Sequence, residues 1–408
     1  MYTHHGIRQE LAARSAAGSI SLTLTGGVAE FGAAPTFTPE PPRLPQVKCF
    51  FPLCLPKREA AETPVNPSAE KKEKLPMRNH FLKISSLLLM LGSLQSVAQL
   101  LPSPATPDNA STPKWTQVFP ETNPLERTGH AMAYDAAAGK VVMFGGLGLK
   151  VTYFNGTFLW NGHNWTQEKP KTSPSARFWH SMAYDGGAKN VVLFGGFDAN
   201  HNILNDTWVW NGSDWKHENP KNVPPGRDQS AMAYDSSDNK VVMFSGGQQL
   251  GSINDTWVWN GSNWTEEHPS EAPSARQGHA MAYDTAKGDV VLFGGFTSGV
   301  GVQNDTWVWN GSNWTEKFPA HSPSPRFDHT LAYDSVRGKV VLFGGADSNN
   351  NPLSDTWVWN GSDWTEEPNT GQPPARYSQA MAYDSSHGEV VLYGGQNTGF
   401  YGDTFVWK

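Results

Sequence analysis

The sequence is poor in cysteine, in long apolar runs and in positive charge. Its 408 residues contain two cysteines, Cys49 and Cys54, so residues 114–408 have no thiol for a disulfide, a cysteine-bound metal or a nucleophile. Residues 114–408 carry 20 Lys and Arg against 30 Asp and Glu, a net charge of −10. An acidic surface repels a phosphate backbone, so nucleic-acid binding is not expected.

Residues 1–76 are expected to be disordered. Ten prolines between positions 35 and 76 and the charged run 70–74 leave too little apolar surface for a core. Cys49 and Cys54 have C-x4-C spacing without a second Cys or His pair nearby, which favours an incidental pair over a metal site.

Residues 77–98 have the three parts of a secretory signal peptide. A basic start at Met77 precedes the eleven-residue apolar run 84–94, and the small residues Ser96 and Ala98 follow at the −3 and −1 positions. The apolar run is too short to cross a bilayer comfortably. We therefore expect a secreted, extracytoplasmic protein.

This position of the signal predicts that Met77 is the true initiator and that residues 1–76 are an extension from a start assigned too far upstream. Residues 99–113 would then be a linker. Two alternatives stay open: an internal signal anchor, which would be the chain's sole contact with a membrane, and a buried helix in a cytosolic protein. A mature N-terminus at Gln99 would indicate cleavage.

One pattern of 49 or 50 residues recurs six times between residues 115 and 408, and such a period indicates a repeat architecture. Each unit contains an Arg, then Tyr-Asp and an apolar run that ends in Gly-Gly, and Trp-Val-Trp closes most units. The Arg residues are Arg127, Arg177, Arg227, Arg276, Arg326 and Arg376. Two units depart from the pattern: the third has Ser245-Gly246 in the Gly-Gly place, and the first has Gly156 where the others have Asp.

Each unit contains four strand-like stretches, which in the fourth unit are residues 278–283, 289–293, 306–309 and 313–316. Asn-Gly joins the last two in five units and predicts a tight hairpin, because type I′ turns need positive φ. No segment of this region has helical periodicity. The sequence therefore predicts an all-β fold.

Six four-stranded antiparallel units fit a six-bladed β-propeller over residues 114–408. The last unit stops at Trp407-Lys408 without its fourth strand, whereas Lys114-Trp115-Thr116-Gln117 matches such a strand before the first unit. The N-terminal strand is therefore expected to complete the last blade, which removes an open sheet edge.

The repeat resembles the kelch motif, which has Gly-Gly after an apolar strand and a separated Tyr and Trp. The resemblance covers residues 115–408 in six copies. It implies a propeller that binds proteins or carbohydrates and only occasionally catalyses a reaction. Galactose oxidase, another kelch-type propeller, uses copper and a Cys-linked Tyr, and this region has no Cys for that cross-link. The sialic acid mutarotases, which are six-bladed and exported, remain a possible relationship, but no motif assigns catalytic residues here.

The repeated side chains are expected to be structural. The Met residues of the Tyr-Asp strands (Met132, Met182, Met232, Met281 and Met381) predict inter-blade core, and the Arg and Asp residues predict charge-assisted hydrogen bonds. The repeated His residues are His130, His180, His279 and His329. Because Ser230 and Gln379 interrupt this series, it favours hydrogen-bonded structure over a metal site. We expect no metal and no cofactor.

Function is expected where the repeats differ. The short Asn-Gly and Tyr-Asp turns share one face, whereas the variable stretches after Gly-Gly and the residues after each Arg share the other. Aromatic and polar side chains on that face suit a sugar or a protein ligand. The ligand-binding candidates are Phe178, Trp179, His201, Asp228, Gln229, Gln277, Phe327, Asp328, Tyr377 and Tyr401.

The sequence thus predicts an exported, monomeric, non-catalytic binding module for a protein or glycan ligand. The rival hypothesis is a carbohydrate-active enzyme similar to a sialic acid mutarotase, which would need a polar cluster at the mouth of the central channel.

Overall fold

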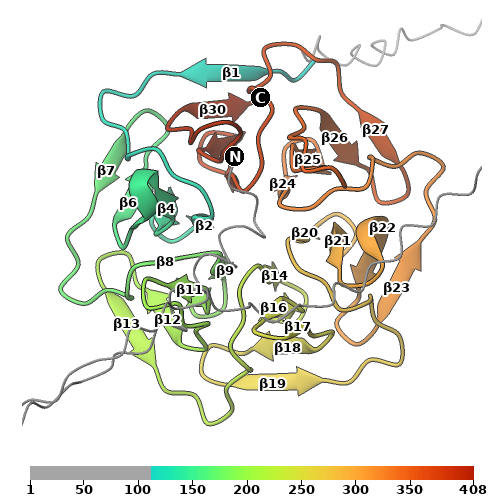
Figure 1. Cartoon of the computed structure of the whole chain (residues 1–408), viewed down its shortest axis with the longest axis horizontal. Coiled ribbons are helices and arrows are strands. Elements are labelled where there is room, and N and C mark those ends of the chain that lie inside the picture. The colour runs from blue at the N-terminus through green and yellow to red at the C-terminus, as the bar shows by residue number, and fades with distance from the viewer. Residues whose placement is uncertain (1–111) are drawn as a thin grey trace, which may run out of the picture. The chain divides into compact units, whose positions relative to one another are not determined.

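A computed structural model describes residues 112–408, which form a ring of six four-stranded sheets (Figure 1). The expectations for residues 1–76 and 77–98, and for most of the linker 99–113, lie outside the described residues. Residues 112–408 contain one short 3₁₀ turn, Leu149–Val151, and none of their helices is long and apolar enough to span a membrane.

Each blade runs outward from the channel in chain order, and its innermost strand contacts the innermost strands of both neighbours. The first blade comprises β2 (Ala131–Asp135), β3 (Lys140–Phe144), β6 (Thr157–Trp160) and β7 (Trp165–Gln167). The second comprises β9 (Ser181–Asp185), β10 (Asn190–Phe194), β12 (Thr207–Trp210) and β13 (Trp215–Glu218). The third comprises β14 (Ala231–Asp235), β15 (Lys240–Phe244), β18 (Thr256–Trp259) and β19 (Trp264–Glu267).

The remaining blades follow the same order. The fourth comprises β20 (Ala280–Asp284), β21 (Asp289–Thr297), β22 (Gly301–Trp309) and β23 (Trp314–Lys317). The fifth comprises β24 (Thr330–Asp334), β25 (Lys339–Phe343), β26 (Thr356–Trp359) and β27 (Trp364–Glu366). The sixth comprises β28 (Ala380–Asp384), β29 (Glu389–Tyr393), β30 (Thr404–Trp407) and, as its outer strand, β1 (Trp115–Val118).

The strand β1 closes the ring as the sequence predicts. It pairs antiparallel with β30 with Trp115 opposite Trp407, and Lys114 N–H donates to the Lys408 carbonyl at 3.0 Å. Figure 1 shows β1 beside β30 at the outer rim. The all-β, six-bladed propeller is thereby confirmed.

The Asn-Gly hairpins differ in detail from the predicted two-residue turn. Trp309 pairs with Trp314, so four residues connect the strands. Asn310 Oδ1 accepts the N–H groups of Ser312 and Asn313, at 3.1 and 2.9 Å, and only Gly311 has positive φ, at +93°. Asn thus acts as an Asx turn rather than as a left-handed residue.

Repeated tryptophans link each blade to the preceding one. Trp215 Nε1 in the second blade donates to Thr157 Oγ1 in the first at 2.8 Å, and each of the other five blades makes the equivalent bond. The ring of Trp215 also packs against Phe144. The Met residues expected between blades are buried there; Met132, for example, packs with Ala380 and Val391 of the sixth blade. The Trp–Thr hydrogen bond repeats at all six interfaces between the blades, so the blades are joined in the same way around the ring.

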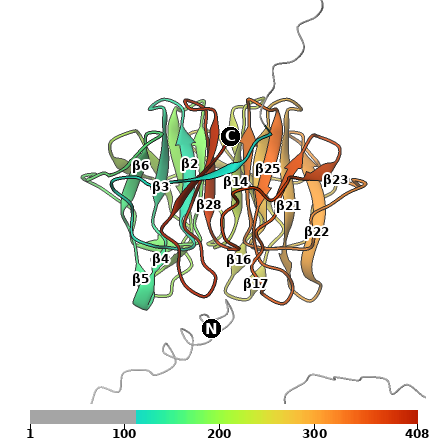
Figure 2. The same cartoon turned by 90° about the horizontal axis from the view of Figure 1, so that it is seen from above.

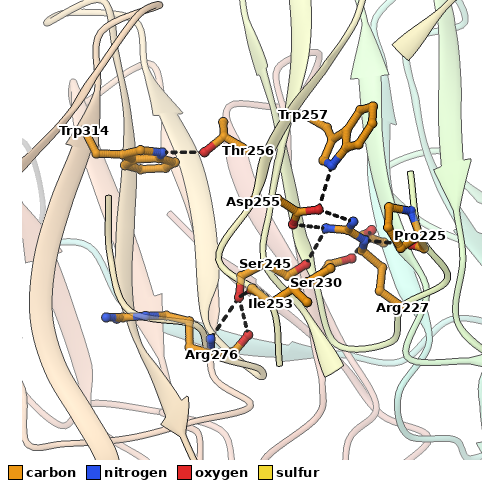
Figure 3. A network of polar contacts seen from close by, with 11 residues as sticks. Pro225, Arg227, Ser230, Ser245, Ile253, Asp255, Thr256, Trp257, Arg276 and Trp314 are labelled. Carbon is orange, nitrogen blue, oxygen red and sulfur yellow. Dashed lines mark hydrogen bonds and ion pairs between the residues drawn. The ribbon is translucent and has the colours of Figure 1, made fainter. Parts of the chain in front are cut away.

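The repeated Arg anchors the loops within its blade, as predicted (Figure 3). Arg227 donates to both oxygens of Asp255, at 2.7 and 2.8 Å, and to the carbonyl of Ser245 at 2.9 Å. Trp257 Nε1 donates to the same carboxylate at 2.7 Å. A bidentate pair with an additional donor is geometrically specific, and so it fixes the loop after Gly-Gly relative to the strands.

The first blade lacks this carboxylate. Gly156 occupies the Asp position, and the guanidinium of Arg127 lies 4.5 Å from the Phe154 ring centroid and 4.9 Å from that of Phe158. Burial lowers the pKa of Arg127 to about 10. Cation–π contacts therefore replace an ion pair in this blade.

Candidate functional site

The propeller has two unlike faces. The turns after the inner strands and the four-residue Asn turns lie on one face, which we call the turn face. The connections after Gly-Gly and the residues after each repeated Arg lie on the other, the loop face. Small ladders extend from the loop face: β4 (Leu147–Gly148) with β5 (Thr152–Tyr153), β8 (Arg177–Phe178) with β11 (Phe197–Asp198), and β16 (Gly247–Gln248) with β17 (Gly251–Ser252). Figure 2 shows β4, β5, β16 and β17 along the same rim.

The channel opens on the loop face through a ring of six residues, each two positions after a repeated Arg. We call it the mouth ring; its members are Gly129, Trp179, Gln229, Gly278, Asp328 and Ser378. Each member's N–H donates to the carbonyl of the member in the preceding blade, at 2.7 to 3.0 Å, and Gly129 completes the circle by donating to Ser378. Six backbone hydrogen bonds therefore encircle the opening.

This circle sets an unusual backbone conformation. All six residues have positive φ, between +50° and +65°. Glycine adopts such values at no cost, but a residue with a side chain is strained there. Trp179, Gln229, Asp328 and Ser378 nevertheless occupy four of the six places. The fold thus fixes the backbone of the mouth and leaves its side chains variable.

The mouth leads to a cavity of about 100 Å³. Gln229 Nε2 donates to Asp328 Oδ1 and Ser378 Oγ to Asp328 Oδ2, both at 2.9 Å. Gln229 and Asp328 are each 7% exposed. The amide oxygen of Gln229 is buried and has no hydrogen-bond partner. The cavity thus holds one carboxylate, one amide oxygen without a donor and the indole of Trp179, and the ring nitrogens of its four imidazoles also have no hydrogen-bond partner.

The next residue of each blade forms a second ring beneath the mouth, which we call the inner ring: His130, His180, Ser230, His279, His329 and Gln379. Each imidazole packs edge-on against the last aromatic residue of the preceding blade's second strand, with ring centroids 5.5 to 5.7 Å apart. Gln379 takes the same place by donating to the Phe343 carbonyl at 2.9 Å.

Burial makes the imidazoles of the inner ring poor bases. It lowers the pKa of His180 and of His329 to about 3, with Arg177 and Arg326 adding to the effect, and it lowers the pKa of His130 and His279 well below the usual range. These side chains are therefore neutral at pH 7. Within residues 112–408, no group of three or more His, Cys, Asp or Glu side chains is placed to hold a metal ion.

Three of the ten predicted site residues meet at the mouth: Trp179, Gln229 and Asp328. Phe178 (1% exposed) and Asp228 (0% exposed) are buried in the loops, and Phe178 packs with Leu147 and Phe197. A ligand would touch Phe178 or Asp228 only after the loops moved, so binding by these two residues stays a prediction.

The other five candidates lie farther from the channel and are half-buried. Gln277, Phe327 and Tyr377 each form a backbone bridge to the segment after Gly-Gly of their own blade. His201 stacks on Phe197 in a loop of the second blade, and Tyr401 lies under the guanidinium of Arg376 at 4.0 Å. Packing thus accounts for the position of His201 and Tyr401, and none of these five residues lines the mouth cavity.

The sequence reasoning missed Ser378 and the two glycines Gly129 and Gly278. Ser378 Oγ donates a hydrogen bond to Asp328, and the glycines leave two sides of the mouth without a side chain. A signal was present: glycine at the same place in two of six repeats indicates a left-handed backbone at that place in all of them.

The comparison with protein families agrees with this architecture. The profile of the KLHDC2/KLHL20/DRC7 kelch-repeats domain matches residues 106–265 and 262–408, together most of the chain. A search of curated proteins found no match. Kelch propellers of this type are generally non-catalytic modules and commonly bind proteins. The six repeats, the closed ring and the profile match together place the chain in the kelch-repeat family.

Proposed function

We propose that the protein is an exported binding module that recognises a protein ligand at the mouth of the propeller channel. The observation that carries the proposal is the mouth ring. Six equivalent backbone positions, fixed by a closed circle of hydrogen bonds, carry five different residue types, whereas the residues that hold the blades together repeat almost unchanged. Variation on an invariant backbone is typical of a recognition surface.

Sugars are a weaker fit than proteins. A sugar is usually held by many hydrogen bonds to its hydroxyl groups, but the N–H and C=O groups of the mouth ring already bind each other. Three side chains of the mouth ring are polar, and two of them, Gln229 and Ser378, already donate to the third, Asp328, while the indole of Trp179 contributes an apolar surface. A ligand with one or two polar groups on an apolar stem fits this chemistry better.

The rival hypothesis, a sugar-processing enzyme, required a polar cluster at the channel mouth. Asp328, Gln229 and Ser378 form such a cluster. General acid–base catalysis works best with a group whose pKa lies near the working pH. Burial lowers the pKa values of the imidazoles that line the cavity well below that range, so they are poor proton acceptors at neutral pH. Binding is therefore the better-supported function.

A peptide library and a glycan array probed with the purified protein test this proposal. We expect peptides to be enriched and their binding to be lost in Trp179→Ala, because the indole would contact the ligand. The control is Phe318→Ala, which removes an aromatic side chain that is 85% exposed. Peptide binding unchanged in Trp179→Ala, or binding of glycans alone, would contradict the proposal.

Export is a separate part of the proposal and rests on the composition of residues 77–98. Sequencing the N-terminus of protein recovered from the medium of the native host tests it. Cleavage after Ala98, with Gln99 first, is the expected result. Retention of the whole chain inside the cell would overturn export without affecting the binding site.

A further inference from the structure

We infer that the mouth cavity binds an ammonium group, supplied by a lysine side chain of the protein partner. The inference rests on the proposed function, because it names the chemical group that the recognition surface accepts. Its basis is the charge, the hydrogen-bonding capacity and the shape of the residues that line the cavity.

The charge of the lining favours a cation. Asp328 is the carboxylate of the cavity, and no Lys or Arg is among the lining residues. The four lining imidazoles are neutral, so nothing in the lining offers positive charge to an anion. The domain around it is acidic, with a net charge of −10 over residues 114–408, and so it attracts cations over a longer range.

The side chain of Gln229 offers a ligand a hydrogen-bond acceptor. The Gln229 amide donates its hydrogen to Asp328 and keeps its Oε1 buried without a partner. A buried acceptor without a donor is costly, and a ligand that supplies the donor recovers that cost. An ammonium carries three N–H donors and no acceptor, so it can serve both Asp328 and Gln229.

The small volume of the cavity, about 100 Å³, favours a narrow stem. Trp179 packs directly on Gly129, where a Cβ would lie 3.0 Å from Trp179 Cδ1 and would crowd the indole. The apolar surface of the indole suits the methylene chain of lysine. On the other side of the mouth, a Cβ on Gly278 would lie 2.6 Å from Asp328 Oδ1. Glycine at these two places lets the indole and the carboxylate lie close against the backbone of the mouth.

A titration with n-butylammonium tests the inference, with n-butanol as the neutral analogue of similar shape. Ligand-observed NMR on the whole protein should detect n-butylammonium and not n-butanol. In Asp328→Asn we expect binding at least tenfold weaker. The matched control is Asp238→Asn, which removes the same charge from an exposed carboxylate on the turn face.

The outcomes distinguish a failure of the ammonium site from a failure of the proposed binding function. If n-butylammonium does not bind, or binds equally to Asp328→Asn, the ammonium site is wrong. Library peptides that bind in a Trp179-dependent way without lysine, and that n-butylammonium does not displace, would also overturn it while leaving the binding function intact. Binding of glucosamine in preference to lysine-containing peptides would overturn lysine as the source. Lysine peptides that n-butylammonium displaces are the supporting result.

Discussion

The residues of the mouth ring and the inner ring are adjacent in sequence, but their side chains differ in variability and in packing. In the mouth ring five residue types share one backbone conformation, and three of the side chains form a polar cluster around Asp328. In the inner ring four of six side chains are imidazoles that pack in the same way against the preceding blade. One residue step therefore separates the proposed recognition surface from a structural layer.

The comparison teaches how a repeat protein can change its ligand without losing its fold. The circle of backbone hydrogen bonds does not depend on side chains, so different side chains can occupy the mouth ring within the limits set by positive φ and by contacts with neighbouring residues. The inner ring is constrained by its aromatic neighbours, and there only Ser230 and Gln379 replace His. Substitutions in the two rings should therefore separate stability from binding.

The largest effect should come from acid. The inner-ring imidazoles have pKa values far below that of an unfolded histidine, so the unfolded chain binds more protons between pH 6.5 and about 3. The contribution of the neutral imidazoles to the free energy of unfolding should therefore be fully present above about pH 6.5 and should be lost as the pH falls. His180 and His329, with pKa values of about 3, should each cost roughly 2 kcal/mol at pH 5.

Comparison with His329→Gln separates the effect of the histidines on stability in acid from the effect of the carboxyl groups. Burial raises the pKa of Asp135 and Asp185, for example, which opposes the loss in acid. Urea unfolding of His329→Gln at pH 7.5 and pH 5 should show a loss smaller than that of the unmodified protein by roughly 2 kcal/mol. The exposed His268→Gln should behave like the unmodified protein. Parallel pH curves for His329→Gln would contradict the assignment.

Truncation in the inner ring should have the next largest effect. His329→Ala removes an imidazole that packs against Phe293 with ring centroids 5.5 Å apart, and the cavity left behind should lower the free energy of unfolding at pH 7.5 by about 3 kcal/mol. His329→Gln should cost less than about 1 kcal/mol, because Gln379 fills the equivalent place in the sixth blade. Equal losses in the two variants would show that the imidazole has a role that packing does not explain.

A smaller loss is expected when a side chain is added to the mouth ring. Gly278→Ala has φ at +65° and places its Cβ against Asp328, so we expect a loss of about 1 to 2 kcal/mol in urea unfolding. Gly299→Ala shares the positive φ, at +79°, but its Cβ meets open space. The excess loss in Gly278→Ala over Gly299→Ala measures the contact with Asp328, and no excess would mean that the carboxylate moves aside freely.

The smallest effect on stability is expected for Asp328→Asn. The amide oxygen can still accept from Gln229, and the amide nitrogen can donate to Ser378 Oγ, so both hydrogen bonds survive. The midpoint of thermal unfolding should correspond to a change below about 1 kcal/mol. A decrease in the free energy of unfolding of more than about 2 kcal/mol would show that Asp328 has a structural role, and the two rings would then not differ in function.

Much of the fold follows from the repeat itself. The period of 49 or 50 residues predicts six blades, and the strand at Trp115 predicts the closure, because strand pairing depends on local composition and on edge satisfaction. The site is less predictable, because exposure depends on the neighbouring blade. Phe178 and Asp228 have the composition of a binding surface, but Phe178 is buried by loops of its own blade and of the preceding one, and Asp228 is buried where it pairs with Gly247 of its own blade.

The backbone of the mouth was hidden for a related reason. Trp179 or Asp328 alone gives no sign of a left-handed conformation, which only the two glycines at the same place reveal. Arg127 shows the same limit: the missing Asp was visible, but its replacement by the rings of Phe154 and Phe158 depends on how a loop folds back.

The pairing of Trp115 with Trp407 has a consequence for synthesis on the ribosome. The strands β1 and β30 lie about 290 residues apart, so at ordinary rates of translation roughly 15 to 60 s pass between the synthesis of β1 and that of β30. Just before β30 is synthesised, the chain has five blades with all their strands and a sixth blade with an unpaired strand edge. A chaperone would be most useful at that stage, and a chain truncated before residue 404 would be an open ring with an exposed edge that can aggregate.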